Sequence, residues 1–251
     1  MNSTITAASV FACLFAAIWT GMRLRRRIHE RHLNAETKDT VKLAMSLVVT
    51  MAALILGLLV NSAKGSYDTT RGEVIQMAAK ISFLDRVLVN YGPEAAEARS
   101  QVHAAVEEMV NRMWPGEGNG PAQLAPNTRT GDAVFAAIQG LAPRNDTQRD
   151  AKAQSASLAV ELAQIRLLLL AQAVSSISKP LLIMVVFWLV VIFLSFSLIS
   201  PPNVISTVAL VASALSVSGA IFLILELDRP FGGLIQISSE PMLNVLNQLA
   251  K

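Results

Sequence analysis

Four apolar segments that contain no Asp, Glu, Lys, Arg or His residue dominate the sequence. They cover residues 7–22, 43–60, 180–199 and 204–225. Each is close to the roughly 20 residues that a helix needs to cross about 30 Å of hydrocarbon. One such segment alone could be a buried helix of a water-soluble core, but four in one chain favour a membrane protein. The sequence therefore predicts an all-α fold with four transmembrane helices.

The residues between the second and third apolar segments are predicted to form a soluble helical bundle. Apolar residues recur there at alternating steps of three and four, which is typical of one buried helix face. They are Val74, Met77, Ile81, Leu84, Leu88 and Tyr91. Gly92 and Pro93 are typical of the end of this helix and the start of the next.

Four parts of the chain follow from these patterns. We expect transmembrane helices 1 and 2 with a basic loop in residues 1–61, and the soluble helical domain in residues 62–178. Transmembrane helices 3 and 4 are expected in residues 179–226, and a C-terminal turn with an amphipathic helix in residues 227–251. No proline interrupts residues 43–91, and no loop signal precedes Pro180 in residues 146–179. Two membrane helices are therefore predicted to continue into the soluble domain, the second interrupted at Pro180.

Positive charge is concentrated in the short loop after the first apolar segment. The loop carries Arg23, Arg25, Arg26, Arg27, Arg31, Lys38 and Lys42. Residues 1–9 carry no Lys or Arg, unlike the start of a signal peptide, so the first segment is expected to stay as an anchor. The turn at residues 200–203 is neutral. Because Lys and Arg in short loops stay in the cytoplasm, the soluble domain and both termini are predicted to be extracytoplasmic.

Small residues at helical spacing mark one face on three of the membrane helices. They are Ser46, Thr50, Ala53, Gly57 and Asn61 in the second helix, Ala209, Ser213, Ser216 and Ala220 in the fourth, and Ala8, Ala12, Ala16 and Thr20 in the first. Such faces let helices approach closely, so ordinary helix packing is one interpretation. The other is that the second helix lines a polar path formed by several subunits. The third helix is bulky along residues 181–193, which is typical of a lipid-facing helix.

No residue set has the pattern of a catalytic, cofactor-binding or metal site, and we do not expect an enzyme. Phosphate loops, nucleophile elbows and zinc-protease motifs are absent from the sequence. Cys13 is the single cysteine, and His29 and His32 stand among arginines that repel a cation, with no third ligand in view. The net charge of +3 is explained by the basic loop, so no nucleic acid is expected as a partner.

The exit of the fourth helix carries a distinctive pattern. Residues 225–233 read Leu-Glu-Leu-Asp-Arg-Pro-Phe-Gly-Gly, and residues 237–242 read Ile-Ser-Ser-Glu-Pro-Met. Together with residues 56–68 and the two-plus-two helix layout, this pattern resembles a bacterial bestrophin-like family. The residues that carry the signature are Asp228, Arg229, Pro230, Phe231 and Gly232.

The resemblance implies kinship with bestrophins, which are oligomeric anion channels, and a place in the bacterial inner membrane. Calcium-activated bestrophins have an acidic cluster after Pro-Phe-Gly, whereas Gly233-Leu-Ile-Gln-Ile follows here, so calcium gating is not expected. Bestrophins also keep their helical region in the cytosol. The charge distribution predicts the opposite side for this chain, and we follow the charge distribution.

The leading functional hypothesis is a homo-oligomeric passive ion channel of bestrophin-like type, for anions. Charges are absent from the four apolar segments, which argues against an ion-coupled transporter more than against a passive pore. The alternative is a non-catalytic membrane interaction or scaffold protein whose extracytoplasmic domain docks a protein partner. In both cases the expected partners are the lipid bilayer and further copies of this chain.

Overall fold

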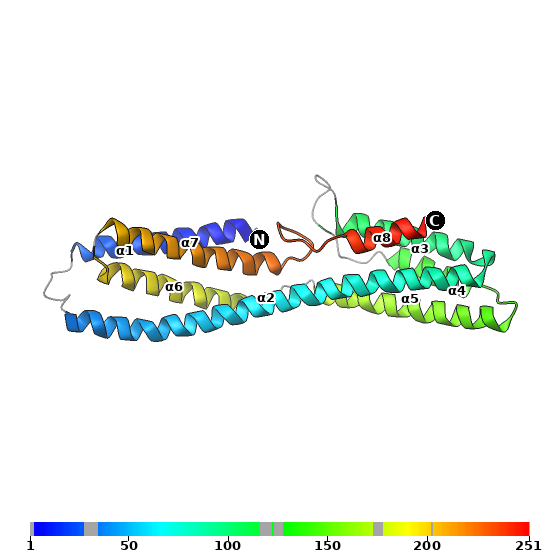
Figure 1. Cartoon of the computed structure of the whole chain (residues 1–251), viewed down its shortest axis with the longest axis horizontal. Helices are drawn as coiled ribbons and strands as arrows, with labels where there is room; N and C mark the ends of the chain where they lie inside the picture. The colour runs from blue at the N-terminus through cyan, green and yellow to red at the C-terminus, as the bar shows by residue number, and fades with distance from the viewer. Residues whose placement is uncertain are drawn as a thin grey trace. The chain divides into compact units, whose positions relative to one another are not determined.

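A computed structural model describes residues 3–27, 35–115, 122, 128–172, 178–201 and 203–250. These residues form helices and no strand (Figure 1). The helices are α1 (Ser3–Arg25), α2 (Ala35–Tyr91), α3 (Ala96–Met113), α4 (Thr128–Gln139), α5 (Asp146–Gln172), α6 (Lys179–Ile199), α7 (Val204–Leu227) and α8 (Glu240–Leu249), with a short 3-10 helix, η2 (Pro93–Ala95). The predicted all-α fold is confirmed.

The chain divides into two compact units. Unit 1 contains Met1–Ser66 and Ser175–Asp228, and unit 2 contains Tyr67–Val174 and Arg229–Lys251. The four apolar segments of the sequence lie in α1, α2, α6 and α7, whose mean hydropathy is between 1.8 and 3.0. The described part of α5 also meets the length and composition of a membrane span, at a lower mean hydropathy of 1.2. The chain is therefore a membrane protein, with the four predicted spans as its most apolar helices.

The long helix predicted after the first loop is present. α2 is one helix of 57 residues that contains both the second apolar segment and the heptad-patterned residues. α5 ends at Gln172, and α6 begins at Lys179 with Pro180 in its first turn. Residues 173–177 lie outside the described residues, so the continuity of that second long helix stays a prediction.

Unit 1 is built by α1 packing against both α6 and α7. Leu14 of α1, Val185 of α6 and Ile221 of α7 are completely buried in this core. Leu59 and Ala63 of α2 join the same cluster. In a bilayer, lipid tails are as apolar as these side chains, so the contact is stabilised by van der Waals packing rather than by removal from water.

The interpretation of α6 as a lipid-facing helix is wrong for one of its faces. Leu182, Val185, Leu189 and Phe193 are buried in the core of unit 1. The opposite face is exposed, as Ile183 shows with 69% of its surface accessible. Both faces are equally bulky, so the sequence gives no sign of which one packs.

Gly21 of α1 lies where α1 closely approaches α6. A Cβ atom at this position would overlap the Ser197 hydroxyl and lie 2.9 Å from the carbonyl oxygen of Leu194. Only glycine fits there without displacing α6, because that carbonyl belongs to the helix backbone.

Unit 2 is built around the heptad-patterned face of α2. All six predicted residues are 3% exposed or less, and they pack against apolar residues of α3 such as Val102 and Val106. The predicted end of this helix is confirmed: α2 ends at Tyr91, Gly92 has a φ of 120°, which favours glycine, and Pro93 opens η2.

The C-terminal segment of unit 2 is attached through an aromatic contact. Phe231 is 5% exposed, and its ring meets Trp114 edge-on with the ring centroids 5.6 Å apart. The Trp114 Nε1–H donates a hydrogen bond of 2.7 Å to the carbonyl oxygen of Ile237, whose own N–H donates to the carbonyl of Pro230 at 2.8 Å. Beyond this turn, α8 packs against α3.

We expect Gly21→Ala to lower the thermal stability of the protein in detergent. The added methyl group forces α1 away from α6, and overpacking of this kind costs about 1–3 kcal/mol. The control is Gly72→Ala in α2, where nothing lies within 4 Å of the new Cβ, so the better helix propensity of alanine should stabilise slightly. Thermal unfolding followed by circular dichroism measures both melting temperatures. Equal values for the two variants would contradict the close approach of α1 to α6.

We expect Phe231→Ala to lower the free energy of unfolding of unit 2 by about 3 kcal/mol, because it removes a buried ring. Phe135→Ala is the matched control, since Phe135 is 41% exposed, and it should cost less than about 1 kcal/mol. Denaturant unfolding followed by tryptophan fluorescence measures both. A Phe231→Ala variant as stable as the control would show that the aromatic contact does not hold the C-terminal segment.

Candidate functional site

The predicted polar face of α2 lies on the outside of the single chain. Ser46, Thr50, Ala53, Gly57 and Asn61, here called the α2 polar face, are all exposed. The helix packs into unit 1 with other residues, of which Ala52, Leu59 and Ala63 are buried. A Cβ atom built on Gly57 meets nothing within 4 Å. The packing of this chain on itself therefore leaves the α2 polar face uncovered.

The hydroxyl groups of this face are already bonded to their own helix. Ser46 Oγ donates to the carbonyl of Leu43 at 2.7 Å, and Thr50 Oγ1 donates to the carbonyl of Ser46 at 2.8 Å. Their oxygens are left to act as acceptors. Asn61 differs, because its amide supplies N–H donors as well as an acceptor.

The small-residue faces of α1 and α7 are also uncovered. In α1, Ala8, Ala12, Ala16 and Thr20 are exposed. In α7, Ser213 and Ser216 are exposed and donate to their own helix backbone, whereas Ala214, one position after Ser213, and Ser218, two positions after Ser216, are buried. Among the described residues of unit 1, helix packing therefore buries large side chains together with other small residues, such as Ala63 and Ala214, and leaves most of the predicted small faces exposed.

Glu226 is a buried acidic residue that the sequence analysis did not single out. It is 1% exposed at the end of α7 and accepts a hydrogen bond from the hydroxyl of Ser3, the first residue of α1. A carboxylate at a helix N-terminus is stabilised by the helix dipole. In the sequence, Glu226 directly follows the charge-free segment 204–225. This position could have marked it as an acidic residue at the end of a membrane helix.

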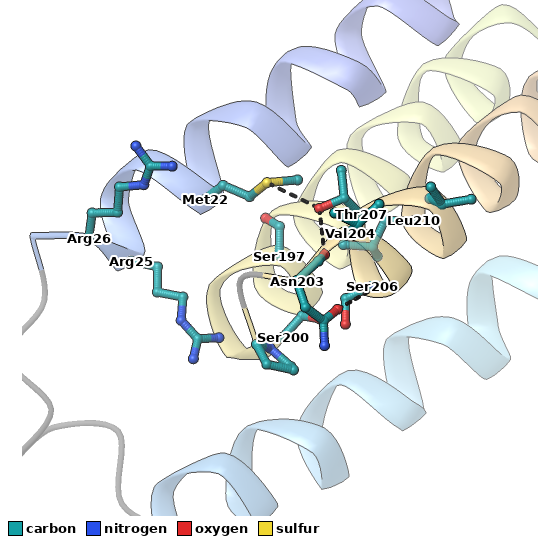
Figure 2. A pocket seen from close by; sticks show the side chains of 12 residues that line it. Met22, Arg25, Arg26, Ser197, Ser200, Asn203, Val204, Ser206, Thr207 and Leu210 are labelled. Atoms are coloured by element: carbon teal, nitrogen blue, oxygen red, sulfur yellow. Dashed lines mark hydrogen bonds between the residues drawn. The ribbon is translucent and has the colours of Figure 1, made fainter.

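A basic pocket lies where α1 ends and α6 turns into α7 (Figure 2). Its volume is about 290 Å³. It is lined by Met22, Arg25, Arg26, Ser197, Ser200, Pro201, Asn203, Val204, Ser206, Thr207, Val208 and Leu210. The sequence analysis treated the arginines as topology signals and the 200–203 turn as neutral, so it missed this site. The two segments are distant in sequence and meet only through helix packing.

Arg25 and Arg26 give the basic pocket its charge, and none of the described residues that line it is acidic. Arg25 Nη1 is buried and has no hydrogen-bond partner in the described part of the chain. In Figure 2 the Arg25 side chain is directed toward the α6–α7 turn, whereas Arg26 points away from it. Thr207 Oγ1 donates to the carbonyl of Asn203 at 3.0 Å and lies 3.9 Å from the sulfur of Met22, which links α7 to α1 at the pocket.

The signature residues lie at the end of α7 and in the turn that follows it. Asp228 caps the C-terminus of α7, and the Gly232 N–H donates to the carbonyl of Arg229 at 3.1 Å. Pro230 and Phe231 form the turn described above. No group of three or more His, Cys, Asp or Glu residues in the described ranges could hold a metal ion. His29 and His32 lie outside those ranges.

Unit 2 contains an apolar cavity of about 540 Å³ between α2, α3, α4 and α5. Its lining includes Met77, Ile81, Met109, Phe135 and Leu167. Cavities of this size and polarity are typical of sites that take apolar ligands or side chains of a partner.

Comparison with known proteins identifies the family of the chain. A Bestrophin-like domain model matches residues 12–242. No curated protein and no solved structure matches the chain. The match covers nearly all of the 251 residues, from α1 through the Pro230–Phe231 turn to the start of α8, and the chain therefore belongs to the Bestrophin-like family.

Proposed function

We propose that the chain is a subunit of a homo-oligomeric membrane assembly that conducts ions passively, anions in the first place, along a path lined by α2. The observation that carries this proposal is the exposure of the whole α2 polar face. In the most apolar 18-residue stretch of α2, 11% of the residues are buried within the chain. The corresponding share is 33% in α1 and in α6. A helix with so little cover in its own chain has most of its surface free for further copies or for lipid.

The composition of the α2 polar face suits contact between copies better than contact with lipid alone. Small residues let helix backbones approach closely, and polar side chains in hydrocarbon are stabilised when they meet other polar groups or water. A ring of such faces around an axis would place hydroxyl, amide and small groups along a narrow path. Passive pores need no more than this, since ions pass constrictions that bind them weakly.

A second candidate is a non-catalytic interaction protein, which the apolar cavity of unit 2 favours. The cavity is open to an apolar group of a partner, and Leu167 at its edge is 62% exposed. In this case the assembly would have no continuous axial path, and the conductance test below separates the two candidates.

For the location, we infer the bacterial inner membrane with unit 2 on the extracytoplasmic side. In a Cys13→Ser background, Ser100→Cys places a single thiol at an exposed position of α3. It should react with an impermeant thiol reagent on intact cells or spheroplasts. The basic loop is expected to stay in the cytoplasm, which leaves unit 2 on the opposite, extracytoplasmic side of the membrane. Glu36→Cys, exposed at the start of α2, should react only after lysis. The reverse pattern of labelling would place unit 2 in the cytosol.

We expect Thr50→Val to reduce the current of the full-length protein in planar bilayers. The substitution keeps the shape of the side chain but removes its oxygen, and an apolar constriction excludes ions by dewetting. Thr20→Val is the matched control: Thr20 is also exposed and donates to its own helix, at 2.7 Å to Ala16, but it lies on α1. Thr50→Lys and Asn61→Asp should shift the reversal potential in opposite directions, toward anions and toward cations.

Oligomeric state is measured first, by native mass spectrometry or light scattering. Wild-type oligomer that passes no current in any tested salt or voltage would exclude the channel and make the interaction protein the leading candidate. If Thr50→Val and Thr20→Val change the current equally, α2 does not line the conducting path.

A further inference from the structure

We propose that the basic pocket of unit 1 binds a phosphate group, carried by a lipid headgroup or free in solution. This site is separate from the α2 polar face and does not depend on ion conduction. The pocket combines a cavity of about 290 Å³ with two arginines, and no acidic residue is among the described residues that line it. Each of these features favours an anion.

The buried guanidinium nitrogen is the sharpest feature of the basic pocket. Arg25 Nη1 is shielded from solvent without a hydrogen-bond partner among the described residues. A charged donor in this state is destabilising unless a ligand accepts its hydrogen bond. The fork of N–H donors on guanidinium matches phosphate oxygens in geometry as well as charge.

Further polar groups surround the same space. Ser200 and Ser206 contribute hydroxyl groups, and Asn203 contributes an amide whose oxygen already accepts from the Ser206 N–H at 2.7 Å. The volume is several times the roughly 30 Å³ that one water molecule occupies. The pocket has room for a polyatomic anion, whose several acceptor oxygens meet its donors better than a single halide does.

The ends of the helices place the pocket at the depth where lipid phosphates lie. α1, α6 and α7 have 23, 21 and 24 residues, or about 32–36 Å at 1.5 Å per residue, which is just enough to cross the hydrocarbon. The pocket is formed by the last turn of α1 and the turn between α6 and α7. Basic residues at this level interact with anionic headgroups.

The test uses the full-length protein in detergent and two probes. Native mass spectrometry compares retention of phosphatidylglycerol with that of diacylglycerol, which has no phosphate, and equilibrium dialysis measures binding of inorganic phosphate. Arg25→Gln should lower binding of the phosphate probe by at least about tenfold, since it removes charge-assisted hydrogen bonds. Arg25→Lys keeps the charge but loses the fork of N–H donors, so its phosphate binding should lie between that of the wild type and that of Arg25→Gln.

The matched control is Arg23→Gln, which removes the same charge from the same helix. Arg23 is exposed and lies 3.7 Å above the ring of Trp19, outside the pocket, so binding should stay within about twofold of wild type. Circular dichroism and gel filtration confirm that each variant is folded. Retention of phosphatidylglycerol without binding of inorganic phosphate identifies a lipid as the source, and binding of inorganic phosphate identifies free phosphate as a ligand.

Two results would overturn the proposal. One is wild-type protein that retains phosphatidylglycerol no better than diacylglycerol and does not bind inorganic phosphate. The other is an equal loss with Arg25→Gln and Arg23→Gln, which would show diffuse attraction by the basic helix end rather than a pocket.

Discussion

Contact between large side chains of α1, α6 and α7 determines how the rest of unit 1 is arranged. Leu14, Val185 and Ile221 are fully buried where these helices meet, and Gly21 allows α1 to approach the backbone of α6. Because lipid competes on equal terms for apolar surface, only close-fitting shapes hold such helices together. α2 contributes only a few residues to this contact, such as Leu59 and Ala63, and both its large and its small residues elsewhere are exposed. The α2 polar face is exposed because α2 lies mostly outside this contact.

The same contact also builds the basic pocket. Arg25 and the 200–203 turn are brought together because α1 packs on α6 near its C-terminus, where a Cβ on Gly21 would meet Ser197. The family signature acts elsewhere, since Phe231 packs on Trp114 and fixes the C-terminal segment to unit 2. Phe231 of the signature therefore acts in the packing of unit 2, and the arginines of the basic pocket lie outside the signature.

The helices could be predicted from the sequence. Which face of each helix is buried could be predicted for the soluble part of α2 but not for the membrane helices. In α2, the residues from Val74 to Tyr91 could be assigned to the core because polar residues mark the other side of a helix in water. In membrane segments, polar residues do not mark the outer side in this way. The sequence of α6 therefore gave no sign that Leu189 is buried and Ile183 exposed. In α7 the exposed Ser213 and the buried Ala214 differ by one position and hardly in size. The pocket was beyond reach for another reason, because its two halves meet only in the folded chain.

The chemistry of the α2 polar face restricts what could make the proposed path prefer anions. Ser46 and Thr50 direct their hydrogens to their own backbone and offer oxygens, which suit cations better. Asn61 supplies N–H donors, and the remaining preference has to come from positive charge at the end of the spans, where Arg23, Arg25 and Arg26 stand. Charge at the mouth of a path raises the local concentration of anions without binding them tightly. A phosphate group held by Arg25 would neutralise part of that charge, so occupancy of the basic pocket and anion conduction would oppose each other.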